Sequence, residues 1–207
     1  MVPGPDLILK LPKSKSLVRI STINSGNTFR AVRWSDAYTY TPMLPEELPL
    51  RVHPVTGEIF LVSRCKEIAE VISGEKDDWK QVPYADNPTA NHYIQALSAD
   101  LARGHRESRM LRICLWWAHN HSVRETGQMT ASPEEFRTNL TALLELIQSN
   151  EGLSDNDRLL AAEIHRELGQ FDEAEALLSV PFNDPLKKIA VQILEWIKLR
   201  NHLVRKF

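Results

Sequence analysis

The feature that most constrains this chain is a change in the spacing of its apolar residues near position 90. From Asn91 onward, apolar residues recur at the three- and four-residue intervals of amphipathic helices. Prolines at positions 42, 45, 49 and 54 exclude a long helix from the earlier part of the chain. The sequence therefore predicts an α+β fold that is mainly α, with a small N-terminal β region followed by antiparallel helical hairpins.

The first part of the chain, residues 1–75, is predicted to be a small β-rich region. Its β-branched and aromatic residues gather in short runs bounded by Pro, Gly, Asn or Ser, as is typical of strands. These runs lie at 7–11, 28–34 and 58–63. Between the last two runs, the segment from His53 to Gly57 is predicted to turn the chain into the third strand.

A short helix is predicted at the end of this region, over residues 65–73. Three apolar residues there have helical spacing: Ile68, Val71 and Ile72. Gly74 is expected to end the helix. Charged residues and two prolines follow, so residues 74–88 are predicted to be a linker.

The helical-hairpin region, residues 89–207, is divided by helix start and stop signals. Gly104 separates the first two predicted helices. Ser132 and Pro133 predict the start of the third, with the Glu135 carboxylate reaching back in a capping box. Further helices are predicted from Ser154 to Gly169, over 171–178, and after Asp184-Pro185.

The segment from Leu160 to Leu178 resembles one tetratricopeptide unit. Ala162 and Ala174 take the positions where two helices approach closely, and Gly169 takes the turn between them. No second copy follows at an offset of about 34 residues, whereas a solenoid needs about three repeats for an independent core. An ordinary antiparallel helix pair and a true repeat are therefore equal alternatives.

A wider set of motifs resembles a group of bacterial proteins to which no activity is assigned. The motifs are Trp34-Ser-Asp36, Pro42-Met-Leu-Pro45, the turn at 53–57, and Leu111-Arg112 followed by Trp116-Trp-Ala-His-Asn120. The resemblance implies a zinc-ribbon-like knuckle after the second motif and a tetratricopeptide-like segment near the end. Because the turn lacks a Cys-x-x-Cys pair, the ribbon implied here is degenerate and holds no metal.

The residues that could carry chemistry are scattered along the sequence. The signatures of nucleotide-binding loops, zinc proteases and serine hydrolases are absent from it. His119 and His121 would point about 200° apart on a helix, which does not suit a shared metal ion. Glu163, His165 and Glu167 are expected on a solvated helix face. The sequence therefore predicts neither a cofactor nor a metal site.

Charge and hydropathy bear on partners and location. The formal net charge is −2 and the isoelectric point is near 6.4, so neither a nucleic-acid nor a membrane partner is expected. No apolar run reaches the roughly eighteen residues of a transmembrane helix, and the first residues do not have the pattern of a signal peptide. We expect a soluble cytoplasmic protein, with Cys65 and Cys114 as reduced thiols.

The function that the sequence favours is a noncatalytic protein-interaction module, because helical hairpins occur without a recognisable active site. A bacterial adaptor and a toxin-neutralising protein of the immunity type both fit this composition. The candidate residues for binding the partner protein are Trp116, Trp196, Lys198 and Arg200. The alternative is a hydrolase or nucleic-acid-processing enzyme that brings together scattered residues, such as Asp36, His53, His119 and His121.

Overall fold

The chain folds as an α+β protein that is mainly α, as its sequence predicts. The structure is a computed structural model, and it describes residues 1–45, 47–72, 78–149 and 152–207. Two compact units are present: unit 1 comprises residues 1–31 and 40–103, and unit 2 comprises residues 32–39 and 104–207. No helix among the described residues is both long and apolar enough to cross a bilayer.

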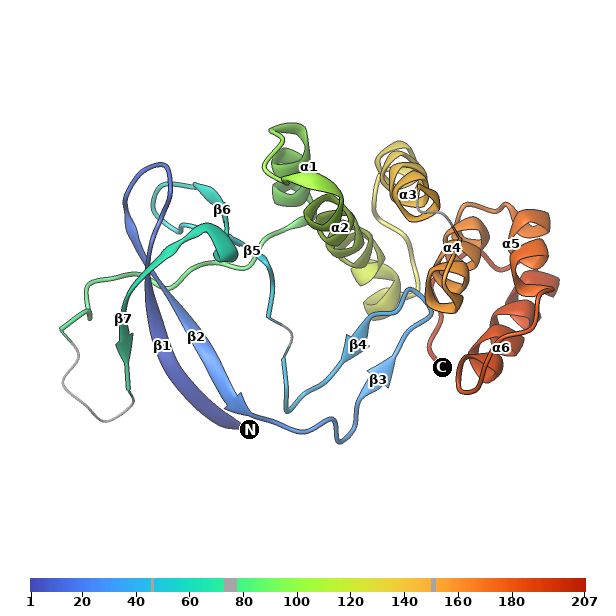
Figure 1. Cartoon of the computed structure of the whole chain (residues 1–207), viewed down its shortest axis with the longest axis horizontal. Helices are drawn as coiled ribbons and strands as arrows, with labels where there is room; N and C mark the ends of the chain where they lie inside the picture. Colours follow the sequence, from blue (N-terminus) through green and yellow to red (C-terminus); the bar gives the residue numbers. More distant parts are fainter. Residues whose placement is uncertain (46, 73–77, 150–151) are drawn as a thin grey trace. The chain divides into compact units, whose positions relative to one another are not determined.

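The centre of unit 1 is a three-stranded antiparallel sheet in the order β2-β1-β7 (Figure 1). The strands are β1 (Val2–Lys10), β2 (Leu17–Ser25) and β7 (Lys66–Val71). In the central strand, Ile8 pairs with Arg19 on one side and with Ala69 on the other. Leu9, Val18 and other buried apolar side chains pack against one another to form the core.

A second hairpin in unit 1 contains the predicted turn at residues 53–57. It joins β5 (Leu50–Val52) to β6 (Ile59–Leu61). The buried ring of His53 accepts the backbone N–H groups of Val55 and Thr56 at Nδ1, each at 3.2 Å. Because Nδ1 accepts, Nε2 carries the proton and donates it to the Leu17 carbonyl at 3.3 Å. His53 therefore stabilises the turn.

The prediction of a helix at residues 65–73 is wrong, because β7 (Lys66–Val71) occupies most of this segment. A 3-10 turn, η1 (Val62–Arg64), precedes it, and β7 then pairs with β1. Short apolar runs have spacings that fit either a helix or a strand, and here the hydrogen bonds offered by β1 decide the outcome. The predicted end at Gly74 lies outside the described residues. Of the predicted strands, 7–11 and 58–63 overlap β1 and β6, whereas only Val32–Arg33 of 28–34 is extended as β3.

The structure describes residues 78–88 of the predicted linker, and these residues pack within unit 1. The N–H of Arg19 donates to the Pro83 carbonyl at 2.8 Å, and that of Val52 donates to the Asp86 carbonyl at 3.2 Å. Helix α1 (Ala90–Ser98) follows, and its residues Tyr93 and Ala96 are buried.

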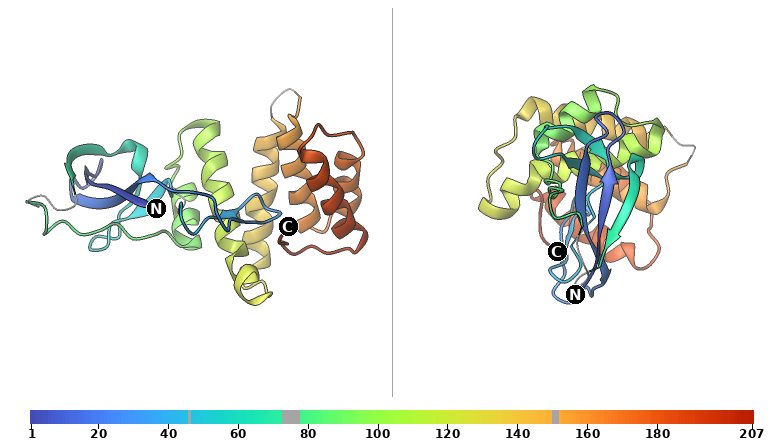
Figure 2. Two further views of the ribbon diagram at one scale, coloured as in Figure 1. Left: turned by 90° about the horizontal axis from the view of Figure 1, so that it is seen from below. Right: turned by 90° about the vertical axis from the view of Figure 1, so that its left-hand side faces the viewer.

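Unit 2 is built mainly from helical hairpins. Its described helices are α2 (Gly104–Thr126), α3 (Pro133–Gln148), α4 (Asp155–Glu167), α5 (Phe171–Leu178) and α6 (Leu186–Lys198). Figures 1 and 2 show α4 between α3 on one side and α5 with α6 on the other. One core cluster, with Leu140 and Ile164, lies toward α3, and a second, with Ala174 and Ile193, lies toward α6.

Helices α4 and α5 form the predicted antiparallel pair. Ala162 and Ala174 are fully buried within one core cluster. Gly169 has a φ of 76°, the left-handed conformation that a glycine adopts without steric cost. Small residues thus lie in the packed core of the pair, and a glycine forms the turn between its helices.

Helix α3 begins where predicted, but the predicted capping box is not formed. Ser132 is the N-cap residue, and its side chain makes no capping hydrogen bond. Pro133 has no N–H and a fixed φ, so this first turn has one fewer unsatisfied donor and needs less capping. At the start of α4, by contrast, the Ser154 hydroxyl accepts the Asp157 N–H at 3.1 Å.

Residues 32–39, which we call the arm, belong to unit 2, although the chain on both sides belongs to unit 1. The arm contains β3 (Val32–Arg33), which pairs with β4 (Thr39–Tyr40). The N–H of Ser35 donates to the Arg205 carbonyl at 2.8 Å, and the N–H of Phe207 donates to the Arg33 carbonyl at 3.1 Å. The arm is therefore joined to the C-terminal segment by backbone hydrogen bonds.

Candidate functional site

The turn of the arm places Asp36 inside unit 2, where its side chain is 0% exposed. The chain reverses at Ala37, and the Trp34 N–H donates to the Tyr38 carbonyl at 2.9 Å. The Asp36 carboxylate accepts the Tyr38 N–H at 3.2 Å, a local bond that aspartate often makes in turns. The indole N–H of Trp117 donates to the Asp36 carbonyl at 2.9 Å. Local turn chemistry and a contact to α2 together fix this aspartate.

Helix α2 supplies three polar side chains at four-residue intervals, which places them on one face. The Arg124 guanidinium forms an ion pair with the Asp36 carboxylate. Asn120 Nδ2 donates to Asp36 Oδ2 and to Glu167 Oε2, both at 3.0 Å. Trp116 Nε1 donates to the same Glu167 oxygen at 2.7 Å. The face thus links the arm to helix α4.

Helix α4 contributes Glu163, Arg166 and Glu167. Arg166 holds Glu163 through two hydrogen bonds, from Nε at 2.8 Å and from a terminal nitrogen at 2.6 Å. The same guanidinium donates to the Leu203 carbonyl at 2.9 Å and to the Asn201 carbonyl. Arg166 therefore connects α4 to the C-terminal segment.

The prediction that Glu163 and Glu167 face solvent is wrong. Both carboxylates are buried, because α4 packs against helices on two sides. His165 is half-buried and bonds the Gln170 side chain at 2.8 Å. Acidic and basic residues three and four positions apart are also typical of exposed helices. The sequence gives no signal that would separate the two cases.

Together these residues form what we call the ionic cluster: Asp36, Arg124, Glu163, Arg166 and Glu167. Its side chains are at most 7% exposed. Three carboxyl groups meet two guanidinium groups, so full ionisation would leave one negative charge without compensation.

The uneven charge of the ionic cluster is reflected in the pKa values of its acids. Burial raises the pKa of Asp36 to about 6, and the nearby Arg124 opposes this shift. Burial, together with the charges of Glu163 and Asp36, raises the pKa of Glu167 well above its usual range. The extra proton that this uneven charge favours is therefore assigned to Glu167, whose burial and acidic neighbours both raise its pKa.

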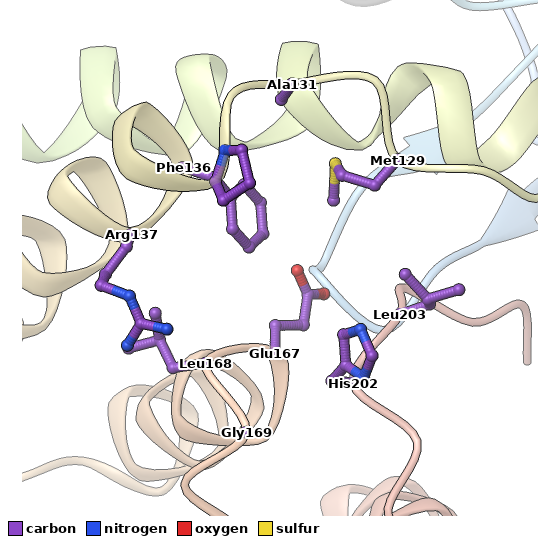
Figure 3. A pocket seen from close by; sticks show the side chains of 10 residues that line it. Met129, Ala131, Phe136, Arg137, Glu167, Leu168, Gly169, His202 and Leu203 are labelled. Atoms are coloured by element: carbon purple, nitrogen blue, oxygen red, sulfur yellow. The ribbon is translucent and has the colours of Figure 1, made fainter.

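A pocket of about 460 Å³ lies beside the ionic cluster, within unit 2 (Figure 3). Its walls come from the loop after α2, the start of α3, the end of α4 and the C-terminal segment. They are mainly apolar, with Met129, Pro133, Phe136, Leu168 and Leu203. Figure 3 shows the Glu167 carboxyl directed toward Phe136 and Met129, with Arg137 on one side and His202 on the other. The Glu167 side chain is itself 0% exposed.

His119, on α2, lies next to this pocket through its contact with Phe136. The two ring centroids are 5.9 Å apart. The residue is 4% exposed, and neither ring nitrogen has a hydrogen-bond partner among the described residues. Burial lowers the pKa of the imidazole, so it is neutral near pH 7.

The residues predicted to bind a partner lie in different environments and do not line the pocket. Trp116 is fully buried and Trp196 is 7% exposed, so both rings pack inside unit 2. Lys198 is exposed and pairs with Glu195 at 2.9 Å. Arg200 is exposed, with its guanidinium 4.8 Å from the centre of the Phe171 ring. Only the two basic residues offer their charged groups to the solvent.

The residues of the alternative enzyme hypothesis in unit 2 do not form one constellation. No hydrogen bond among the described residues joins any two of Asp36, His119 and His121. His121 is exposed and pairs with Glu125 at 3.2 Å. Among the described His, Cys, Asp and Glu residues, no group of three or more is placed so that it could hold a metal ion.

The two cysteines are free thiols. Cys114 is buried on α2, and burial raises the pKa of Cys65 in unit 1 to about 11. A thiol with a raised pKa is a poor nucleophile near neutral pH, because little thiolate is present.

The chain matches no protein-family model, no curated protein and no solved structure at a significant level.

Proposed function

We propose that this protein is a noncatalytic protein-interaction module whose helical unit binds a short segment of a partner protein. One observation carries the proposal: unit 2 holds a short turn-forming segment, the arm, with Ser35 and Asp36 buried. The arm is held by backbone hydrogen bonds to the C-terminal segment and by the buried Asp36. Binding a partner segment would use the same combination of backbone contacts and one fixed side chain.

The pocket is where such a segment would insert a side chain. Two residues that line the pocket share a hydrogen-bond donor with the arm: Glu167 shares Asn120 with Asp36, and Leu203 shares Arg166 with Ser35. Protein interfaces are commonly anchored by one large side chain that fills an apolar pocket. A cytoplasmic adaptor and a toxin-neutralising protein are the two finer forms of this proposal, and they differ only in the identity of the partner.

The side chains of the ionic cluster are hydrogen-bonded or ion-paired with one another, and this favours a binding function over a catalytic one. The carboxylates of Asp36 and Glu163 are each held by a guanidinium, and that of Glu167 accepts from Trp116 and Asn120. A general base must have an oxygen or nitrogen within reach of the substrate. These carboxylates have exposed fractions of at most 1%, so they serve the fold of unit 2.

Co-purification with matched variants tests the proposal. Ala131→Trp should fill the pocket, because Ala131 lines it, and Arg106→Ala removes an exposed cation of α2 that does not line it. After crosslinking in the cell of origin, mass spectrometry should find one protein at equal stoichiometry with the native chain and with Arg106→Ala. That protein should be lost with Ala131→Trp. Identical sets of proteins for all three would contradict the proposal.

A further inference from the structure

We infer that the pocket, on which the proposed function rests, accepts one large apolar side chain of a partner protein, flanked by an aspartate or glutamate. The occupant is thus a short acidic segment and not a basic or neutral one. Three observations in unit 2 lead to this inference: the apolar walls, the charge at the rim, and the way in which the arm is held.

The walls suit an apolar side chain. Phe136, Leu168 and Leu203 line a space of about 460 Å³, which lies within the roughly 300–1,000 Å³ typical of ligand pockets. Filling the pocket would remove apolar surface of the chain and of the partner from water, and this burial favours binding.

The rim supplies positive charge and N–H donors. Arg137 and His202 are exposed, and neither has a hydrogen-bond or ion-pair partner among the described residues. Figure 3 shows them on opposite sides of Glu167. A guanidinium can hold a carboxylate through two parallel hydrogen bonds, and an imidazole donates one.

The acidic residues nearby do not cancel this charge. Glu167 is the only acidic residue among the described residues that line the pocket, and its carboxyl is fully buried and held by Trp116 and Asn120. Glu134 and Glu135 are exposed in the first turn of α3, and they do not line the pocket. Among the described residues that line the pocket, Arg137 and His202 are the cation and the imidazole available to a carboxylate at the rim.

The arm shows how unit 2 holds an aspartate that has aromatic residues on both sides in the sequence. The Asp36 carboxylate pairs with Arg124, and the same guanidinium lies 4.3 Å from the centre of the Tyr38 ring and 5.8 Å from that of Trp34. A carboxylate flanked by large rings is thus held by an arginine of the helical unit. At the pocket, Arg137 and the preceding Phe136 likewise supply a guanidinium and an aromatic ring.

Peptide binding to the full chain tests the inference. Three fluorescein-labelled peptides are compared by fluorescence anisotropy: Gly-Asp-Phe-Asp-Gly, Gly-Asn-Phe-Asn-Gly and Gly-Lys-Phe-Lys-Gly, all with blocked ends. The acidic peptide should saturate below about 1 mM and bind about fivefold more tightly than the neutral one, as expected for one exposed ion pair with Arg137 and one hydrogen bond from His202. The lysine peptide should bind most weakly.

The variants separate the pocket from its rim. The double variant Arg137→Ala, His202→Ala should reduce the affinity for the acidic peptide to that for the neutral peptide, and Arg106→Ala should leave the preference unchanged. Ala131→Trp, or Ala131→Leu if the larger side chain disturbs folding, should weaken binding of both peptides. Equal affinity for the acidic and neutral peptides, a preference for lysine, or no saturable binding would overturn the inference. The co-purification experiment would still decide the proposed function.

Discussion

Trp116 and Glu167, which are 51 positions apart in the sequence, are joined by a 2.7 Å hydrogen bond from the indole Nε1 to a carboxyl oxygen. Both side chains are fully buried. The indole N–H is a neutral donor, so it does not supply the positive charge that would hold a buried carboxyl in its ionised form. The hydrogen bond from Trp116 lowers the pKa of Glu167, but burial and the charges of Glu163 and Asp36 outweigh it and raise that pKa.

The raised pKa values of Asp36 and Glu167 have a defined effect on stability. A carboxyl whose pKa is higher in the folded state than in the unfolded state binds its proton more tightly after folding. The resulting stabilisation is complete below the unfolded pKa, about 3.8 for Asp36, and is lost as pH rises through the folded pKa of about 6. Glu167 contributes in the same direction, because its pKa in the folded state also lies well above its usual range.

Glu167→Gln should remove the pH dependence that Glu167 contributes. Glutamine keeps an oxygen acceptor for the Trp116 indole and has no proton to lose. Relative to the native chain, the free energy of unfolding of the variant should rise between pH 5 and pH 8, because only the native chain loses the stabilisation of a tightly held proton in that range. Urea unfolding at both pH values measures this. His119 also titrates differently in the two states, but it does so in both proteins and cancels in the comparison. Parallel pH profiles would refute the assignment of the proton to Glu167.

Asp36→Ala should destabilise unit 2, because it leaves Arg124 buried without its carboxylate. The expected loss is about 3–5 kcal/mol of unfolding free energy, the usual cost of removing one partner of a buried ion pair. Glu125→Ala, an exposed acid on α2 that pairs with His121, is the control and should change stability by less than about 0.5 kcal/mol. Equal denaturant midpoints for the two variants would show that the ion pair does not hold the arm.

His119→Leu should stabilise the protein. The imidazole is buried, and its two nitrogens have no partner among the described residues, so folding removes them from water without replacing their hydrogen bonds. Leucine has a similar volume and keeps the apolar contact with Phe136. We expect a gain of about 1 kcal/mol in unfolding free energy, measured by urea titration. A loss of that size would mean that the ring nitrogens are hydrogen-bonded in solution.

Local patterns in the sequence predict much of the helical half and of the turn at 53–57. Gly169, Ser154 and the alanines of the α4–α5 pair act within a few residues of where they stand, so their roles can be inferred from spacing alone. The segment at 65–73 was predicted wrongly, because its conformation depends on pairing with β1, about 60 residues earlier in the sequence.

The ionic cluster could not be predicted from the sequence, because its contacts join distant residues. Asp36 is 84 positions from Asn120 and 88 positions from Arg124. Nothing near Asp36 in the sequence indicates that the arm enters unit 2. For Glu163 and Glu167, the spacing of acids and bases is the same whether a helix is exposed or packed on both sides. The sequence therefore identified Asp36 only as one of several scattered acids and histidines.

Ala174 and Ala176 offer a matched test of the helix pair, because they lie on the same helix in different environments. Ala174 is fully buried in the core cluster with Ala162 and Ile193, whereas Ala176 is exposed. Ala174→Leu should overpack the core and reduce the free energy of unfolding by about 1–3 kcal/mol. Ala176→Leu introduces the same side chain where there is room for it. It should change stability by less than about 0.5 kcal/mol, because alanine and leucine have similar helix propensities. Denaturant unfolding of both variants measures the difference, and indistinguishable midpoints would show that α4 and α5 are not packed as described.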